Sequence, residues 1–371
     1  MSTLELDVRT RLGAFGLEAA FAAPATGITC LFGRSGAGKT TLINILAGLL
    51  RPSSGRVALG DEVLFDSARG IDVPPERRGF GYVFQEGRLF PHMTVRRNLL
   101  YGANRQPAAG RQRRLDHAVD LLAIEPLLER RPRDLSGGEK QRVAIGRALM
   151  TAPRLLLMDE PLAALDPGLK AEILPYIERL RDIEGVPIVY VTHTIEEIVR
   201  LATTLVLVSD GEVAAVGAVD ELMNRLDLRP LTGRYEAGAV IETIVAEQEA
   251  DGLTALTFAG GTLLVPRIEA EVGTPLRVRV RARDVSLSLT APPDISILNA
   301  FPGEVREVGP VDGALQDIGV DIGVPLWSRV TARSAARLEL RPGRRVVALV
   351  KAVAIDRHSF GGVRDRPLTG P

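Results

Sequence analysis

The chain has 371 residues, enough for two or three domains of ordinary size. Its 46 basic and 46 acidic residues cancel, and 46% of its residues are hydrophobic, which is typical of a soluble globular protein. This balance disfavours a mainly disordered chain. It also disfavours nucleic acid as a partner, because duplex binders carry a basic excess. The single cysteine, Cys30, allows no intrachain disulfide and fits a reducing, cytoplasmic setting.

Neither a targeting segment nor a membrane-spanning segment is expected. The first residues lack a basic region followed by an apolar stretch, so we expect no signal peptide. No run approaches the ~20 apolar residues that a spanning helix needs. A role at a membrane would therefore be played from outside the bilayer.

Up to about residue 225, short apolar runs alternate with helical patterns, which predicts an α/β layer with a largely parallel sheet. The predicted buried strands are 28–32, 81–84, 155–158, 188–191 and 205–208. The predicted helices are 40–49, 139–150, 169–183 and 195–201. Residues 96–134 break the alternation and predict a helical insertion.

The strongest motif is a glycine-rich phosphate loop, which fits G-x-x-x-x-G-K-[ST] between a predicted strand and a predicted helix. Such a loop points successive backbone N–H groups at a phosphate, and the helix N-terminus adds a favourable dipole. Lys39 is expected to reach the β- and γ-phosphates of ATP, and Thr40 to bind Mg²⁺. The candidate nucleotide-binding residues here are Gly33, Arg34, Ser35, Gly36, Ala37, Gly38, Lys39, Thr40 and Thr41.

A second motif is the apolar run 155–158 that ends in two acids, Asp159 and Glu160. In α/β proteins ligands bind where strands end, so these carboxylates are candidates for a catalytic site. We expect Asp159 to hold the Mg²⁺ shell and Glu160 to orient or deprotonate the attacking water.

After about residue 229 the pattern changes to short strands punctuated by Gly and Pro. A weak internal repeat lies in this part: 261–268 matches 323–330, and 273–285 matches 343–355 without a gap. The second alignment sets Arg281 against Lys351. We therefore expect two similar small β units, followed by a frayed polar tail.

With Leu135-Ser-Gly-Gly-Glu-Lys-Gln141 opening a helix, the chain resembles the ATP-binding cassette (ABC) ATPases. The resemblance implies that Gln85 senses Mg²⁺ and the membrane partner, and that Asp166 communicates across a dimer. It also implies that His193 contacts the γ-phosphate, which makes Glu160, His193, Lys39 and Gln85 the catalytic set. Phe15 either stacks on adenine or is an ordinary core residue.

The same resemblance implies a homodimer. In the family, the serine and glycines of the signature, here Ser136, Gly137 and Gly138, close on the γ-phosphate of ATP held by the other subunit. The chain has one phosphate loop and one signature, so two sites require two chains placed head to tail. Thr40, Gln85 and Asp159 are the expected Mg²⁺ contacts.

A finer resemblance, carried by 81–92, 135–152 and 282–287, is to the ATP-binding subunits of molybdate importers. It implies that residues 291–357 form a small molybdate-binding β module. The candidate oxyanion residues, matched to the family, are Ser296, Thr331, Ser334 and Lys351. One departure is Leu298, which stands where related sensors often have arginine, so the module either binds oxyanion or only dimerises.

The expected fold is therefore an α/β P-loop NTPase of the ABC type with a helical subdomain, followed by an all-β OB-like barrel. The expected domains are 1–228 (helical subdomain about 86–150), a first β unit at 229–290, the β module at 291–357 and a tail at 358–371. The expected partners are a second copy, membrane permease subunits and, indirectly, a periplasmic or extracellular substrate-binding protein. The expected location is the cytoplasmic face of the inner membrane. The alternatives are an importer of another solute, such as sulfate, iron or a sugar, and a non-transport ABC ATPase.

Overall fold

The computed structural model describes residues 2–103, 110–225, 227–228, 231, 238–355 and 360–362. By its internal contacts the chain forms two units. The first comprises Met1–Thr194 and Leu201–Gly217, and the second comprises Ile195–Arg200 and Ala218–Pro371. None of the helices in the described ranges is long and apolar enough to cross a membrane.

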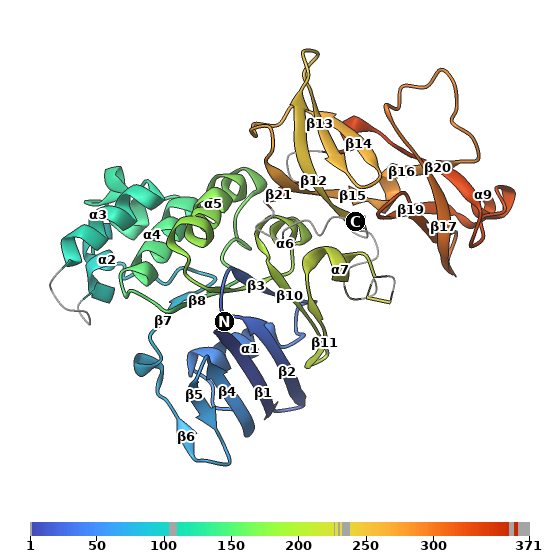
Figure 1. Ribbon diagram of the computed structural model, residues 1–371. Coiled ribbons are helices and arrows are strands. Elements are labelled where there is room, and N and C mark those ends of the chain that lie inside the picture. The colour runs from blue at the N-terminus through green and yellow to red at the C-terminus, as the bar shows by residue number, and fades with distance from the viewer. Residues whose placement is uncertain are drawn as a thin grey trace. The chain divides into compact units, whose positions relative to one another are not determined.

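In the described part of the first unit, eleven strands form one sheet (Figure 1). In their order across the sheet they are β6 (Ile71–Asp72), β5 (Glu62–Asp66), β4 (Ser54–Leu59), β1 (Thr3–Leu12), β2 (Phe15–Pro24), β11 (Glu212–Gly217), β10 (Thr204–Ser209), β3 (Ile28–Phe32), β9 (Ile188–Thr192), β8 (Leu155–Asp159) and β7 (Phe80–Val83).

Strands β10, β3, β9, β8 and β7 are parallel to one another. Every residue of β3, β8 and β9 is buried, as expected for parallel strands covered on both faces. The expected α/β layer is thus confirmed, and each of the five predicted strands lies within two residues of an observed one at both ends. Because the five strands are parallel, their carboxyl ends meet at one edge of the sheet.

The strands on the other side of this sheet pair antiparallel with their neighbours, except that β2 is parallel to β11, so the expectation of a largely parallel sheet holds only for the five strands above. Strands β1 and β2 form a hairpin of ten paired positions, and β1 also pairs with β4. Burial alternates along β2 from Leu17 to Ala23, so one face packs on the core and the other faces solvent.

The helices of the first unit are α1 (Lys39–Ala47), α2 (Val95–Ala103), α3 (Arg111–Leu122), α4 (Gly137–Leu149) and α5 (Pro167–Arg179). Short 3₁₀ turns lie at Pro75–Arg77, Glu125–Leu127 and Pro132–Asp134, and a π turn spans Leu180–Glu184. Helices α2 to α5 gather in one group (Figure 1); α2, α3 and α4 lie within the predicted bounds of the helical subdomain, about 86–150, and α5 lies outside them.

The second unit opens with α6 (Ile195–Leu201) and α7 (Val219–Met223) and continues as the expected all-β part. Its described strands form two sheets of five. One contains β14 (Gly261–Pro266), β13 (Leu253–Phe258), β12 (Gly238–Gln248), β15 (Pro275–Arg281) and β21 (Phe360–Gly362). The other contains β16 (Val285–Ser288), β20 (Arg345–Val350), β17 (Asn299–Asp312), β18 (Leu315–Asp321) and β19 (Pro325–Thr331). A short helix, α9 (Ala332–Arg337), follows β19.

The chain passes between the two sheets, so that a strand following one sheet pairs in the other. After β15 the chain crosses to the second sheet, where β16 pairs with β20. After β20 it returns to the first sheet, where β21 pairs with β15. A single hydrophobic core includes Val278 and Val280 of one sheet with Phe301 and Trp327 of the other.

The weak sequence repeat corresponds to this exchange. Strand β15 is followed by a 3₁₀ turn at Ala282–Asp284, and β20 is followed by one at Ala352–Ala354. The residues before the turns, Arg281 and Lys351, have nearly the same backbone angles, with φ of −72° and −70°. Of the expected tail, 358–371, only Phe360–Gly362 fall within the described residues, and they form β21.

One buried arginine supports the helix that follows the phosphate loop. The Nη1 atom of Arg78 donates to the carbonyl oxygens of Ile45 and Leu46, both at 2.8 Å, and its Nε donates to Val73 O at 2.8 Å. Its side chain is 2% exposed and lies 3.6 Å from Asp72. The last carbonyls of a helix have no partner within it and carry the negative end of its dipole, so Arg78 stabilises the C-terminus of α1.

We expect Arg78→Met to lower the free energy of unfolding of the first unit by about 3 kcal/mol or more, because two buried carbonyls and a half-buried one lose a charged donor. Arg51→Met is the matched control, because Arg51 lies 3.4 Å from the same Asp72 but is 70% exposed. It should cost less than about 0.5 kcal/mol. Urea unfolding followed by circular dichroism would measure both, and equal losses would contradict this role of Arg78.

Candidate functional site

The candidate site lies where four neighbouring parallel strands end. The phosphate loop follows β3, Glu160 follows β8, His193 follows β9, and Gln85 comes two residues after β7. The strands lie in the order β3, β9, β8, β7, so the hydrogen-bonded register brings these residues to one edge of the sheet. Open α/β sheets bind ligands at this edge.

Lys39 is buried inside the phosphate loop, with 4% of its side chain exposed. Its Nζ donates to Gly33 O at 2.8 Å and Arg34 O at 3.0 Å, and it lies 3.8 Å from Glu160 Oε1. Burial lowers the pKa of the ammonium, while the charges of Glu160 and Asp159 oppose that shift. The ammonium is therefore held next to carboxylates at the place where a phosphate would be recognised.

Thr40 and Asp159 meet across the site. The Thr40 hydroxyl donates to Asp159 Oδ1 at 3.2 Å, although the two residues are 119 positions apart. Burial raises the pKa of Asp159, and the hydrogen bond from Thr40 opposes the shift. A hydroxyl and a carboxylate side by side are hard oxygen ligands of the kind that Mg²⁺ prefers, so this pair fits the ion.

Two residues that the sequence analysis missed complete this network. The Tyr82 hydroxyl donates to Asn44 Oδ1 at 3.0 Å, which links β7 to α1. Burial is the largest cause that raises the pKa of Tyr82, followed by the charge of Asp159. Tyr82 lies in the stretch 81–92 that carries the finer resemblance, but no role was assigned to it, and Asn44 lies in the helix after the loop, outside the recognised motifs.

Glu160 and His193 form a pair. His193 Nδ1 lies 3.2 Å from Glu160 Oε2, and the Glu160 side chain is 19% exposed. Glu160 also has a φ of +45°, which is unusual for a residue other than glycine. Strain of this kind persists only where the surroundings hold it, and its N–H donates to Val191 O of β9 at 3.1 Å.

Phe15 lies against the phosphate loop. A Cβ added to Gly38 would lie 2.7 Å from Leu17 Cδ1 and 3.1 Å from Phe15 Cζ, so both side chains cover this glycine. Gly38 also has a φ of +106°, which other residues rarely adopt. Phe15 is half-buried and packs on the sheet core, so both interpretations of it, as an adenine contact and as a core residue, stay open.

The signature residues open α4 at the surface. Ser136 and Glu139 form a capping box: Glu139 N donates to Ser136 Oγ at 3.2 Å, and Ser136 N donates to Glu139 Oε2 at 2.7 Å. The latter bond is the main cause that lowers the pKa of Glu139. Ser136 and Gly137 are exposed, and no described hydrogen bond joins Ser136 to the phosphate loop.

The loop that contains Asp166 packs beside the signature. A Cβ on Gly137 would lie 3.0 Å from Leu165 Cδ2, and one on Gly138 would lie 3.3 Å from Leu169 Cδ2. Asp166 itself caps α5 by accepting from Leu169 N at 3.1 Å. These glycines therefore allow the start of α4 to approach this loop closely.

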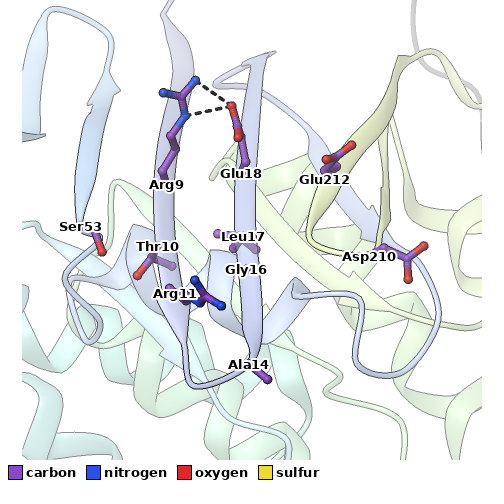
Figure 2. A pocket seen from close by; sticks show the side chains of 10 residues that line it. All are labelled: Arg9, Thr10, Arg11, Ala14, Gly16, Leu17, Glu18, Ser53, Asp210 and Glu212. Atoms are coloured by element: carbon purple, nitrogen blue, oxygen red, sulfur yellow. Dashed lines mark hydrogen bonds and ion pairs between the residues drawn. The ribbon is translucent and has the colours of Figure 1, made fainter.

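A pocket of about 500 Å³ lies at the β1–β2 hairpin (Figure 2). Arg9 of β1 and Glu18 of β2 line it and form an ion pair, with 2.7 Å between Nη2 and Oε1, and both side chains are more than 60% exposed. Leu17 lines the pocket and also covers Gly38 of the phosphate loop.

The described hydrogen bonds join only two of the four candidate oxyanion residues. Thr331 and Ser334 share a hydrogen bond of 2.9 Å at the start of α9. Lys351 follows Val350, which pairs with both Asn299 and Val285, and Ser296 lies three residues before Asn299. Ser328 of β19, three residues before Thr331, donates to Val285 O at 2.7 Å, so β19 also lies beside β16. A common site for all four residues therefore stays a prediction.

Two family models match different parts of the chain, and curated relatives match nearly all of it. The model of the ABC transporter family matches residues 18–163, and the TOBE domain model matches residues 295–356. The chain is 52% identical to the molybdenum import ATP-binding protein ModC of Paramagnetospirillum magneticum, over 97% of this chain and 99% of that protein. It is 50% identical to the protein of the same name from Mesorhizobium japonicum, over 97% of each chain.

Two solved structures are similar to the first part of the chain. One is a dimeric ATP-binding cassette, MJ0796, in a post-hydrolysis state bound to ADP and Pi, with a TM-score of 0.50 and 27% identity. That match covers 59% of this chain and 99% of that one. The other is a nucleotide-free cassette from an ABC transporter, with a TM-score of 0.51 and 26% identity, covering 60% of this chain and 93% of that one.

We expect Lys39→Ala to weaken ATP binding at least tenfold, because each lost charge-assisted contact is worth roughly 1.5–3 kcal/mol. Titration of the purified chain with a fluorescent ATP analogue would measure this loss. Lys170→Ala, which removes one of the other three lysines, should leave the affinity unchanged. Equal affinities of the wild type and Lys39→Ala would contradict the placement of the phosphates at this loop.

Proposed function

The chain belongs to the ABC transporter ATPases, in the group of molybdenum import ATP-binding proteins, and from this membership we propose that it hydrolyses ATP to drive molybdate import. The observation that carries the proposal is the identity of about half of all residues over nearly the whole chain, C-terminal β unit included. The phosphate loop alone would support only an ATPase.

In the proposed reaction, Lys39 binds the β- and γ-phosphates. Its ammonium exchanges the carbonyl oxygens of Gly33 and Arg34 for phosphate oxygens, which carry more charge. The backbone N–H groups at the start of α1 supply further donors, and the helix dipole favours the anion.

Glu160 orients the attacking water. Water attacks the γ-phosphorus, its proton passes to the Glu160 carboxylate, and the bond from phosphorus to the β-phosphate oxygen breaks to release ADP and phosphate. His193, 3.2 Å from Glu160, is placed to hold the carboxylate and to donate to the γ-phosphate.

Thr40 and Asp159 would hold Mg²⁺, with Gln85 at the end of the neighbouring strand as a third contact. When bound, the ion neutralises charge on the β- and γ-phosphate oxygens. Asp159 would bind Mg²⁺ as the ionised carboxylate, so it must lose its proton before the ion binds.

The exposed signature supports a homodimer. Ser136 and Gly137 face solvent at the start of α4, where they are available to a nucleotide on a second copy. A dimer in which each signature closes on the phosphate loop of the other copy would complete two sites. The dimeric cassette among the similar structures agrees with such an arrangement.

The remaining partners follow from the import function. We propose that permease subunits in the inner membrane carry the substrate and that this chain binds to their cytoplasmic side. A periplasmic or extracellular substrate-binding protein would deliver molybdate to them. In this arrangement the selectivity of the import pathway lies mainly in those other chains.

Glu160→Gln should trap the dimer, because it keeps the shape of the side chain but cannot accept the proton of the attacking water. We expect the purified variant to sediment as a dimer with ATP and Mg²⁺ and as a monomer without nucleotide. Glu160→Gln combined with Lys39→Ala should stay monomeric. A Glu160→Gln protein that remains monomeric with saturating ATP would contradict the head-to-tail dimer.

The candidate oxyanion residues suggest that the C-terminal β unit senses molybdate at an interface between two copies. Thr331 and Ser334 share a hydrogen bond at the start of α9, and Lys351 follows β20. The proposed site takes these residues, together with Ser296, from two copies of the β unit. Such a sensor could slow import through a coupling of about 1–3 kcal/mol.

Calorimetric titration of the full chain with molybdate, tungstate and sulfate tests this part of the proposal. We expect saturable molybdate binding that Lys351→Ala removes, since Lys351 supplies a positive charge to the dianion. Arg306→Ala, which removes an exposed cation of β17, is the control and should bind normally. Absence of binding would reduce the module to a dimerisation element, and preferential sulfate binding would favour an importer of another oxyanion.

A further inference from the structure

Strand β15 has an arginine face. Its residues alternate, so that Val278 and Val280 point into the hydrophobic core while Arg277, Arg279 and Arg281 occupy the opposite face of the sheet. Only 1% of the Arg279 side chain is exposed. A guanidinium buried to this extent is stable only with a charged or hydrogen-bonding partner, because desolvation of an unpaired charge is costly.

The partner of this face is helix α6. Arg279 Nη1 lies 2.6 Å from Glu196 Oε1, and Arg281 Nη2 lies 3.7 Å from the same oxygen. Glu196 stands in the first turn of α6, where a carboxylate is also favoured by the helix dipole. Two arginines therefore converge on one carboxylate at the start of the helix.

The end of α6 is held on the same sheet by its backbone. Strand β21 lies next to β15, and a Cβ placed on its Gly361 would collide with the carbonyl oxygen of Val199 in α6. Only glycine permits this approach. The helix is thus fixed at its start by an ion pair and near its end by close backbone packing, which explains why residues Ile195–Arg200 group with the second unit.

Helix α6 begins at Ile195, only two residues after His193. The peptide chain therefore leaves the catalytic end of β9, passes His193 and enters directly a helix that is fixed on the C-terminal β sheet. We infer that the ion pair between Glu196 and Arg279 positions His193 for ATP hydrolysis. Glu196 and Arg279 are positioning residues that act through α6, and this inference rests on the proposed ATPase function.

The ion pair should affect the rate of ATP hydrolysis and not the binding of ATP. His193 must stay within hydrogen-bonding distance of Glu160, and a displacement of about 1 Å at a reacting group can cost up to 100-fold in rate. Lys39 stands at the start of α1, and its described hydrogen bonds go to Gly33 and Arg34 of the phosphate loop rather than to α6. Loss of the ion pair should therefore lower kcat and leave the KM for ATP nearly unchanged.

The test compares steady-state ATP hydrolysis by the purified full-length wild type and its variants. We expect Glu196→Gln to lower kcat at least about fivefold while the KM for ATP changes less than about twofold. Arg279→Lys should retain at least about half of the wild-type kcat, because the contact involves one nitrogen and a lysine can supply a point charge. Asp321→Asn breaks an exposed pair with Arg306 in the second sheet and should change neither constant.

Each outcome either supports or overturns the positioning role of Glu196 and Arg279. A Glu196→Gln protein with wild-type kcat, or one in which KM rises as much as kcat falls, overturns the positioning role. If Glu196→Gln does not fold, Glu196→Asp replaces it: the charge is kept, the reach is shortened by one methylene, and kcat should fall at least about threefold at constant KM. An unchanged kcat in that variant overturns the inference. A wild-type chain without ATPase activity would instead refute the proposed function.

Discussion

The candidate ATPase site depends on the register of four parallel strands. Strands β3, β9, β8 and β7 end together, and this brings Lys39, Glu160 and His193 within contact although the chain between them is long. Every residue of β3, β9 and β8 is buried and β7 is buried at alternate positions, which makes a shift of register costly. The site is therefore as rigid as the sheet, and the strained backbone of Glu160 is held by a bond from its own N–H to β9.

The parallel strands and the motifs at their ends could be predicted from the sequence, because each is marked by a pattern of neighbouring residues. A continuous apolar run such as 28–32 or 188–191 has no polar face, so a buried strand is the natural interpretation. The phosphate loop, the acid pair and the signature each lie at a strand end or a helix start, where the chemistry needs them. The hydrogen bond from Thr40 to Asp159 follows from that placement.

Other features depend on contacts between distant segments, which no local pattern records. Strand β2 is rich in alanine, which weakens its alternation, whereas β1 alternates clearly between apolar and polar residues and was still not among the predicted strands. Tyr82 and Asn44 meet only because β7 and α1 share the sheet. The oxyanion candidates were matched one by one to a family, and of the four only Thr331 and Ser334 share a described hydrogen bond.

The exchange of β16 and β21 bears on how the second unit is made. Strand β21, which closes the first five-stranded sheet beside β15, follows β20 of the second sheet along the chain. During synthesis β15 therefore keeps an open edge until all strands of the second sheet have been made, and open edges invite pairing with other chains. The two sheets cannot be completed one after the other. Removal of β21 would leave the edge of β15 exposed to aggregation.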